Sequence, residues 1–201
     1  MTSILKVDTI QDTAGNNIIN ESGDTITIGA SGDTITIPSG ATITNSGTAT
    51  GFGKVLQVVQ TVLTTVTSTT STSLVDISGL SLSITPSSAS NKVFILVDMA
   101  LSESTANNLV AWNLVRNSTN LAVGTSSATF QQTGVAINDV TTGGNMLLKQ
   151  STQYLDSPST TSATTYKIQW KTSGGTIYIN RRATDAYMSV SSMITAFEIE
   201  A

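Results

Sequence analysis

The sequence has no cysteine and no histidine among its 201 residues. The missing cysteines exclude thiol nucleophiles, thiolate metal sites and disulfide cross-links. The missing histidines exclude Ser–His–Asp triads and histidine acid–base chemistry. We therefore expect no catalytic residue, no cofactor and no metal site in this chain.

Charged residues are also scarce, at 11% of the chain against about 25% in a typical soluble domain. The net charge is −4, which argues against nucleic-acid binding because such binding needs a basic surface. No apolar run approaches the roughly 18 residues of a membrane span, and the first residues lack the apolar core of a signal peptide. We expect no membrane insertion, and assembly in a cytoplasm followed by exposure to the outside.

A nonapeptide repeat occupies residues 22–53, where the letters GDTITI occur twice. Isoleucines recur nine residues apart, at Ile26, Ile28, Ile35, Ile37 and, in a degenerate third copy, Ile43. Isoleucine alternates with threonine, which is typical of a strand with one apolar face, and Gly, Pro, Ser and Asp mark the turns. Each copy is too short to form a core by itself.

Three arrangements could bury these isoleucines. A single-chain solenoid needs about three good repeats plus caps, and this chain has two good copies. Disorder is disfavoured because strictly alternating β-branched residues favour strands. We therefore predict a trimeric β shaft in which the isoleucines face a shared axis. Calcium-binding nonapeptides have a similar pattern, but the second glycine before Asp33 is missing, so a turn-capping aspartate is the preferred interpretation.

The shaft separates an N-terminal segment, residues 1–21, from a C-terminal domain, residues 54–201. The domain contains eight or so strand-like runs separated by turn signals, which predicts an all-β fold with a jelly-roll-like β-sandwich. Residues 54–67 could instead form a helix of a trimeric coiled coil, since their apolar residues share a helical face. The weak helix propensity of Val and Thr favours a strand, apolar and therefore covered on both faces.

Several individual strands can be predicted from the pattern. Residues 93–101 are apolar on both faces apart from Asp98, which predicts a central strand. Residues 166–181 predict a hairpin around Gly174 and Gly175, and residues 187–199 predict a last strand with a bulge near residue 191. Residues 124–144 are rich in Gly, Ser and Thr and predict long loops.

Motifs at both ends of the chain resemble fibre proteins of tailed bacteriophages, especially those of marine cyanophages. They are LKVDTIQ at residues 5–11, the GDTITI repeats, SGTATGFG at 46–53, YKIQWK at 166–171, IYINR at 177–181 and SMITAFEI at 192–199. The resemblance implies a homotrimer with an N-terminal virion anchor, a β shaft and a distal sandwich head related in shape to TNF or C1q domains. It brings no catalytic motif, and the short chain favours a short tail fibre or a fibre that decorates the virion head.

Two groups of residues are candidates for contacts with partners. Ile4, Leu5, Val7 and Ile10 have no evident partner in their own chain, so we expect them to dock on a tail, portal or capsid protein. In the head, we expect the loops around 124–144 and 182–187 to contact a host surface glycan or receptor. The candidate contact residues are Arg182, Tyr187 and Phe130. Arg182 could equally pair with Asp185.

Other polar and aromatic residues have a simpler structural interpretation. Trp112 and Trp170 lie in strand patterns and are expected in the core. Glu198 and Glu200 share one face of the last strand, where they are expected to protect a sheet edge rather than cleave glycans. A polysaccharide depolymerase remains an alternative function, but it would need a long β-helix and a carboxylate cluster. A decorating fibre without a receptor role is the second alternative, and in each case the expected location is the virion.

Overall fold

The computed structural model describes residues 55–105, 108–125, 132–137 and 146–201, together with residues 34, 36–42, 44 and 46. The chain divides into two units, Met1–Thr50 and Gly51–Ala201. In the first unit, the Ala41 amide donates to the Pro38 carbonyl oxygen at 3.1 Å, and the Ile37 side chain is 47% exposed in the single chain.

Most of the predicted shaft and anchor residues lie outside the described residues. These are Ile26, Ile28, Ile35 and Ile43 of the shaft and Ile4, Leu5, Val7 and Ile10 of the anchor. Their roles stay predictions.

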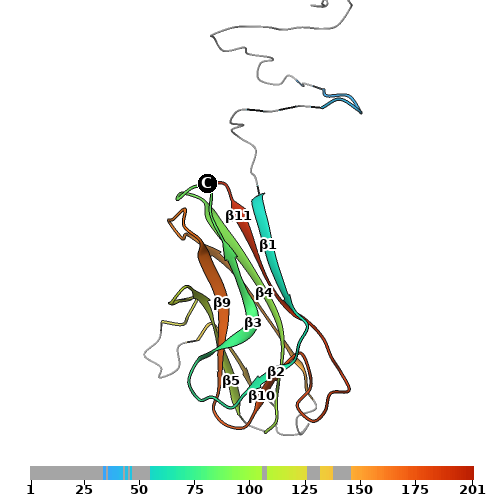
Figure 1. The fold of residues 1–201 in the computed structure, drawn as a ribbon, viewed down its shortest axis with the longest axis vertical. Helices are drawn as coiled ribbons and strands as arrows, with labels where there is room; N and C mark the ends of the chain where they lie inside the picture. The colour runs from blue at the N-terminus through green and yellow to red at the C-terminus, as the bar shows by residue number, and fades with distance from the viewer. Residues whose placement is uncertain are drawn as a thin grey trace, which may run out of the picture. The chain divides into compact units, whose positions relative to one another are not determined.

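The second unit is built of strands, and its described residues contain no helix (Figure 1). In chain order the strands are β1 Val55–Leu63, β2 Thr67–Thr69, β3 Val75–Ile84, β4 Lys92–Glu103, β5 Leu109–Arg116, β6 Thr119–Leu121, β7 Gly134–Ile137, β8 Leu148–Asp156, β9 Thr164–Thr172, β10 Ile177–Ile179 and β11 Ser192–Ile199. The all-β prediction is confirmed. The alternation of apolar and polar residues along these runs explains why they form strands with one face in a core.

The strands form two sheets, one of six and one of five strands. In the six-stranded sheet, β11 and β10 pair one after the other along the same edge of β4, and β1 and β2 pair with β11 and β10 in the same way. β8 occupies the other edge of β4. In the five-stranded sheet, β6 and β7 share one edge of β5, and the order continues through β9 to β3. Each sheet therefore has four rows of strands.

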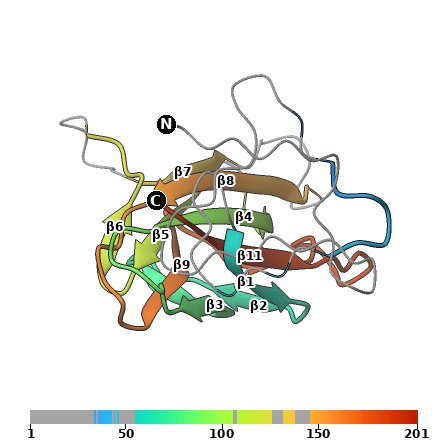
Figure 2. The ribbon, with the colours of Figure 1, turned by 90° about the horizontal axis from the view of Figure 1, so that it is seen from above.

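The chain visits these eight rows in a definite order. Counting β1–β2, β6–β7 and β10–β11 as one row each, the six-stranded sheet has the row order 1-8-3-6 and the five-stranded sheet 2-7-4-5. Figure 2 shows β8, β4, β11 and β1 side by side in one layer. All consecutive rows except the fourth and fifth lie in different sheets, so nearly every connection crosses from one layer to the other.

The core lies between the two sheets and takes alternate residues from every layer. From β4 these residues are Val93, Ile95, Val97, Met99 and Leu101. Trp112 and Trp170 are also buried there, as predicted. Gly134 faces the Trp112 ring, where an added Cβ would lie 2.3 Å from indole carbons, so only glycine fits beside this indole.

The structure shows which secondary structure the first apolar segment of the domain adopts, and it corrects the burial expected for that segment. Val55–Leu63 is a strand, as favoured over the coiled coil. The prediction that both of its faces are covered is wrong for the single chain, because Val55, Val58 and Val62 are about half exposed. One sheet packs against only one face of β1, so its second apolar face has no cover from the described residues.

Three further predictions are corrected. The hairpin at 166–181 is wrong, since β9 and β10 belong to different sheets and residues 173–176 carry the chain across the core, with Gly175 at φ 69°. Both strands alternate because each faces the same core from opposite sides. β11 begins at Ser192, so the change of parity before it marks a returning loop rather than a bulge. Residues 134–137 form β7 within the expected loop region.

Candidate functional site

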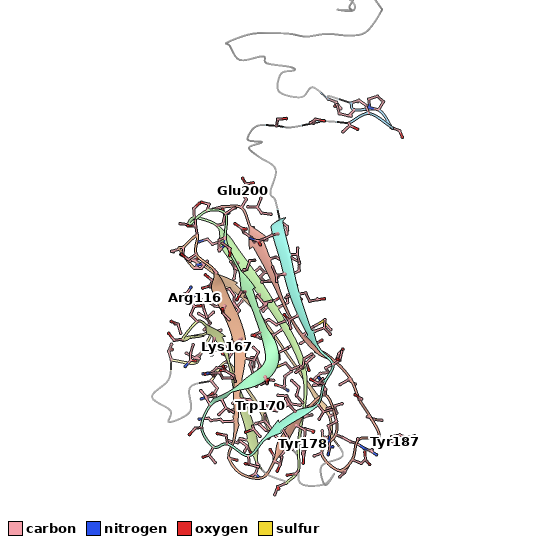
Figure 3. The ribbon with its side chains drawn as sticks, viewed as in Figure 1. Arg116, Lys167, Trp170, Tyr178, Tyr187 and Glu200 are labelled. Atoms are coloured by element: carbon pink, nitrogen blue, oxygen red, sulfur yellow. The ribbon has the colours of Figure 1, made fainter. Side chains whose placement is uncertain are left out.

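The eighth row is interrupted between β10 and β11, where residues 181–191 leave the sheet and return (the 181–191 loop). Figure 3 shows Tyr178 and Tyr187 toward one end of the unit and Glu200 at the opposite end. β1 begins at Val55, which pairs with Ile199 near that opposite end. The 181–191 loop is therefore remote from the point where β1 begins.

A buried asparagine holds both interrupted rows together at the base of this loop. The Asn180 side chain donates to the carbonyl oxygens of Leu63 at 2.7 Å and Thr65 at 3.0 Å, which bridges the gap between β1 and β2. Its Oδ1 accepts a hydrogen bond from the Ser192 hydroxyl at 2.6 Å, and that hydroxyl accepts from the Ala100 amide at 3.0 Å. Asn180 has φ 67°, a left-handed conformation that asparagine tolerates better than most residues.

The 181–191 loop is fixed by its own hydrogen bonds. The Val190 amide donates to the Asn180 carbonyl oxygen at 3.0 Å and closes the base. Arg182 donates two hydrogen bonds to Asp185, at 2.6 and 2.7 Å, and the Tyr187 amide donates to the same carboxylate at 3.0 Å. The hydrogen bond from Arg182 lowers the pKa of Asp185. Such a loop presents its outer side chains in a defined arrangement.

The loop brings together two of the three predicted receptor-contact residues. The Arg182 guanidinium lies 5.4 Å from the centre of the Tyr187 ring, and Tyr187 is 83% exposed. The alternative pairing of Arg182 with Asp185 is also present, so the ion pair and the aromatic contact coexist. Met188 and Val190 add exposed apolar surface to the same loop. Phe130 lies outside the described residues.

A second candidate surface is the face of the six-stranded sheet that points away from the core (the outer sheet face). Cross-strand pairing places these side chains on it: Val58, Gln60 and Val62 of β1, Met193, Thr195 and Phe197 of β11, Phe94, Leu96 and Asp98 of β4, and Ser151, Gln153 and Leu155 of β8. Most of them are apolar, and Val58, Val62, Leu96 and Leu155 are strongly exposed.

The middle of the outer sheet face is hollowed. The hollow has a volume of about 800 Å³, and its lining includes Leu96, Met193 and Phe197. Gln60 donates to the Thr195 hydroxyl at 2.9 Å, and Lys149 donates to Asp98 at 2.6 Å. Ser151, Thr152 and Gln153 of β8 also line the hollow. Asp98 is therefore a surface ion-pair partner beside a hollow that apolar and polar side chains line together.

Glu198 has a role that differs from the predicted edge protection. β11 lies between β1 and β4, so the residue is not on a sheet edge, and its side chain points inward and is buried. The carboxylate accepts hydrogen bonds from Asn91 at 2.6 Å, Gln57 at 2.6 Å, and the Ser87 amide and hydroxyl at 2.7 and 2.8 Å. Burial alone would raise its pKa, but these donors lower the pKa to about 2.

Another buried carboxylate joins the two sheets. Asp156 of β8 accepts hydrogen bonds from Arg116 of β5 at 2.8 Å and from the Tyr166 hydroxyl of β9 at 2.6 Å. Burial and the hydrogen bond to Asp156 raise the pKa of Tyr166, which keeps the phenol protonated as a donor. This cluster links the layers across the core and has a structural role.

Glu103 is a buried carboxylate of a different kind, at the end of β4. Burial raises the pKa of Glu103 to about 7, although hydrogen bonds from Thr172 and from residues 104, 105 and 108 oppose this rise. The native state therefore holds a proton on this group at pH values where an unfolded chain releases it.

We expect the stability of the protein to fall as pH rises from 4.5 to 7 because of Glu103. The group has a raised folded-state pKa, so its stabilising contribution is complete below pH 4.5 and is lost through pH 7. The expected loss is on the order of 3 kcal/mol. Denaturant unfolding at several pH values should show this slope in the wild type and a flatter profile in Glu103→Gln. Identical profiles for the two proteins would contradict the assignment.

Sequence reasoning missed the role of Asn180 at the base of the 181–191 loop and the buried position of Glu198. Asn180 gave no signal beyond its place after a short strand. Glu198 could have been found from its parity, because Ile194 and Ala196 share its face. Among the described residues, no group of three or more acidic side chains is placed to hold a metal ion. The described part of the chain also contains no helix long and apolar enough to span a membrane.

Comparisons with known proteins give only distant likenesses. No protein-family model and no curated protein matches the chain. It is similar to solved structures of infectious bursal disease virus: the Gt strain (TM-score 0.40, 12% identity, 79% of this chain and 43% of that chain) and the VP2 subviral particle (0.39, 12%, 71% and 39%). The chain thus spans less than half the length of these proteins. At such TM-scores the likeness identifies neither a family nor a function.

Proposed function

We propose that this protein is a homotrimeric structural fibre protein of a tailed-bacteriophage virion. Its N-terminal residues would anchor it to other virion proteins, and its C-terminal domain would bind a glycan or receptor on the host cell surface. It would work without a catalytic site or a cofactor. Assembly would take place in the host cytoplasm, and the mature protein would reside in the virion.

The observation that carries this proposal is the arrangement of the second unit. Its row order, 1-8-3-6 and 2-7-4-5, supports an eight-stranded jelly roll, a fold that viral capsid and lectin domains use. β1 begins at one end of this unit, directly after the repeat, and the 181–191 loop lies at the other end. A head attached at one end leaves the opposite end open to a partner, which is what an attachment fibre needs.

The repeat and the 181–191 loop supply the remaining support. Two good nonapeptide copies are too few for a single-chain solenoid, and three chains around an axis would bury their isoleucines. At the far end, an exposed tyrosine beside a fixed arginine is a suitable platform for a sugar ring and its polar substituents. Binding residues are commonly placed on loops held by a rigid scaffold.

Removing residues 2–20 tests the proposal directly. The truncated chain should fail to enter virions, because the apolar anchor residues are lost. It should still form a soluble trimer by light scattering, lighter than the full-length trimer, whose expected mass is near three times 20.9 kDa. In full-length protein, Arg182→Ala with Tyr187→Ala should leave incorporation intact and lower adsorption to host cells at least tenfold. Ser118→Ala, in the exposed turn after β5, is the control for adsorption.

Each arm has an outcome that contradicts it. Truncated chains that still assemble onto particles would show that the anchor lies elsewhere. A monodisperse monomer of the full chain would exclude the homotrimer. Normal adsorption by the loop variant would leave a decorating fibre without a receptor role as the function.

A further inference from the structure

We propose that the outer sheet face is the surface through which the C-terminal domain packs against a second copy of this chain. The proposal deepens the homotrimer proposed above and rests on it. It concerns the second unit, whereas the trimer was predicted from the repeat. The occupant is another copy of the domain, and the surface is defined by described residues.

The two outer faces of this unit differ sharply in polarity. On the five-stranded sheet, the outward side chains of β3 and β9 are polar or charged, including Asp76, Ser81, Ser83, Lys167 and Gln169. An antiparallel sheet facing water normally shows this pattern. The outer sheet face instead carries valine, leucine, methionine or phenylalanine at seven of the twelve outward positions named above.

The apolar groups form one continuous surface rather than isolated exposed residues. Phe94 and Phe197 lie side by side, with ring centres 6.3 Å apart, and Leu155 pairs with Phe94 across β8 and β4. Val58 pairs with Phe197 and Val62 with Met193 on the other side. The surface therefore crosses all four rows of the sheet. Contiguous apolar surfaces of this kind mark contacts with other macromolecules.

The chain itself indicates a second copy as the occupant. Val55, where β1 begins, follows Ile43, the last isoleucine of the repeat, by twelve residues, which reach at most about 43 Å. Three chains joined at the repeat, as proposed above, would therefore keep their three C-terminal domains within tens of ångströms of one another. β1 carries Val58 and Val62 of the outer sheet face, so this face is held at high local concentration beside its copies.

The paired polar groups of the face agree with this occupant. Asp98 and Lys149 pair with each other, so identical faces meet without net charge repulsion in the middle of the contact. Lys92 lies beyond it at the end of β4 and donates to Ser157. Gln60 and Thr195 are also bonded to each other, so this pair can be covered by a second copy without leaving its groups unsatisfied.

Thiol labelling of the full-length protein tests the proposal, since the natural chain has no cysteine. Val62→Cys places one thiol on the outer sheet face, and Val135→Cys places one on the other sheet. The two valines have nearly equal exposure in the single chain, 47% and 44%. A maleimide should react at least tenfold more slowly with Val62→Cys than with Val135→Cys. Val58→Cys should behave like Val62→Cys, and urea should abolish the difference.

The purified sample contains only copies of this chain, so protection that is lost on dilution to the monomer identifies a second copy as the cover. Protection that persists in the monomer would overturn the proposal, because the cover would then be a segment of the same chain. Equal rates at positions 62 and 135 would overturn the proposal, even if light scattering shows a trimer held by the repeat. Protection that arises only in assembled virions would also overturn it and assign the face to another virion protein. If the chain without residues 2–20 still enters virions, that result contradicts the proposed anchor and leaves the packing of the outer sheet face untouched.

Discussion

Replacing Glu198 by alanine is expected to lower the free energy of unfolding by about 3–5 kcal/mol. The carboxylate accepts four hydrogen bonds, from Asn91, Gln57 and both donors of Ser87. Alanine removes the acceptor from the buried Asn91 donor and from the part-buried Gln57 and Ser87 donors, and each group that stays unsatisfied costs about 1–3 kcal/mol. The loss should also loosen residues 85–91, which the carboxylate ties to the last strand.

The pH dependence distinguishes this role from simple packing. Because the donors lower the pKa of Glu198 to about 2, its contribution is complete above pH 4.5 and is lost as pH falls toward 2. The stability difference between wild type and Glu198→Ala, measured by denaturant unfolding, should therefore narrow on acidification. Glu200→Ala is the matched control, since this half-buried neighbour should cost under about 1 kcal/mol. Equal losses in the two variants would contradict the assigned network.

The strands that the sequence pattern located well are those with a strong and unambiguous period. Val93–Leu101 was predicted as a central strand because both of its faces are apolar, and β4 does pair on both edges. Trp112 and Trp170 are predicted in the core because they lie within strand patterns, and both are buried. Local alternation depends on which side chains face the core, and this property is largely decided within one strand.

The assignment of strands to sheets could not be read in this way. β9 and β10 alternate as a hairpin would, and glycines lie between them, yet they face each other across the core. Alternation shows that a strand has one buried face, but it does not show to which of the two sheets the strand belongs. The sequence pattern also gives no sign that the eighth row is interrupted at Asn180. The interruption depends on hydrogen bonds to the carbonyl groups of Leu63 and Thr65, which are far away in the chain.

Polarity misled the interpretation of β11 for a physical reason that bears on its function. Met193 and Phe197 are large and apolar, yet they face outward, while the inward face carries Ala196 and the bonded Glu198. From sequence alone the outward face resembles the core face. β1 repeats this inversion with Val58 and Val62. Large apolar residues on the outward side of a sheet are expected when a partner covers that side.

The substitution Ile35→Asp is expected to lower the melting temperature of the trimer by about 10 °C or more. Ile35 lies outside the described residues, so this expectation comes from the repeat. Burial of one isoleucine is worth roughly 1.5–3 kcal/mol, and a threefold axis repeats each loss three times. Three aspartates near one axis would also place like charges together without partners.

Thr36→Asp is the matched control for this register. Residue 36 is exposed in the single chain, and on a strand its side chain points away from the face that carries Ile35. The same charge should then lie in solvent, and the melting temperature should change by only a few degrees. Melting curves at equal protein concentration would make the comparison. Equal losses in both variants would reject the inward isoleucine register, whereas loss in Ile35→Asp alone, with the thiol at position 62 becoming reactive, would tie the shaft to the packing of the heads.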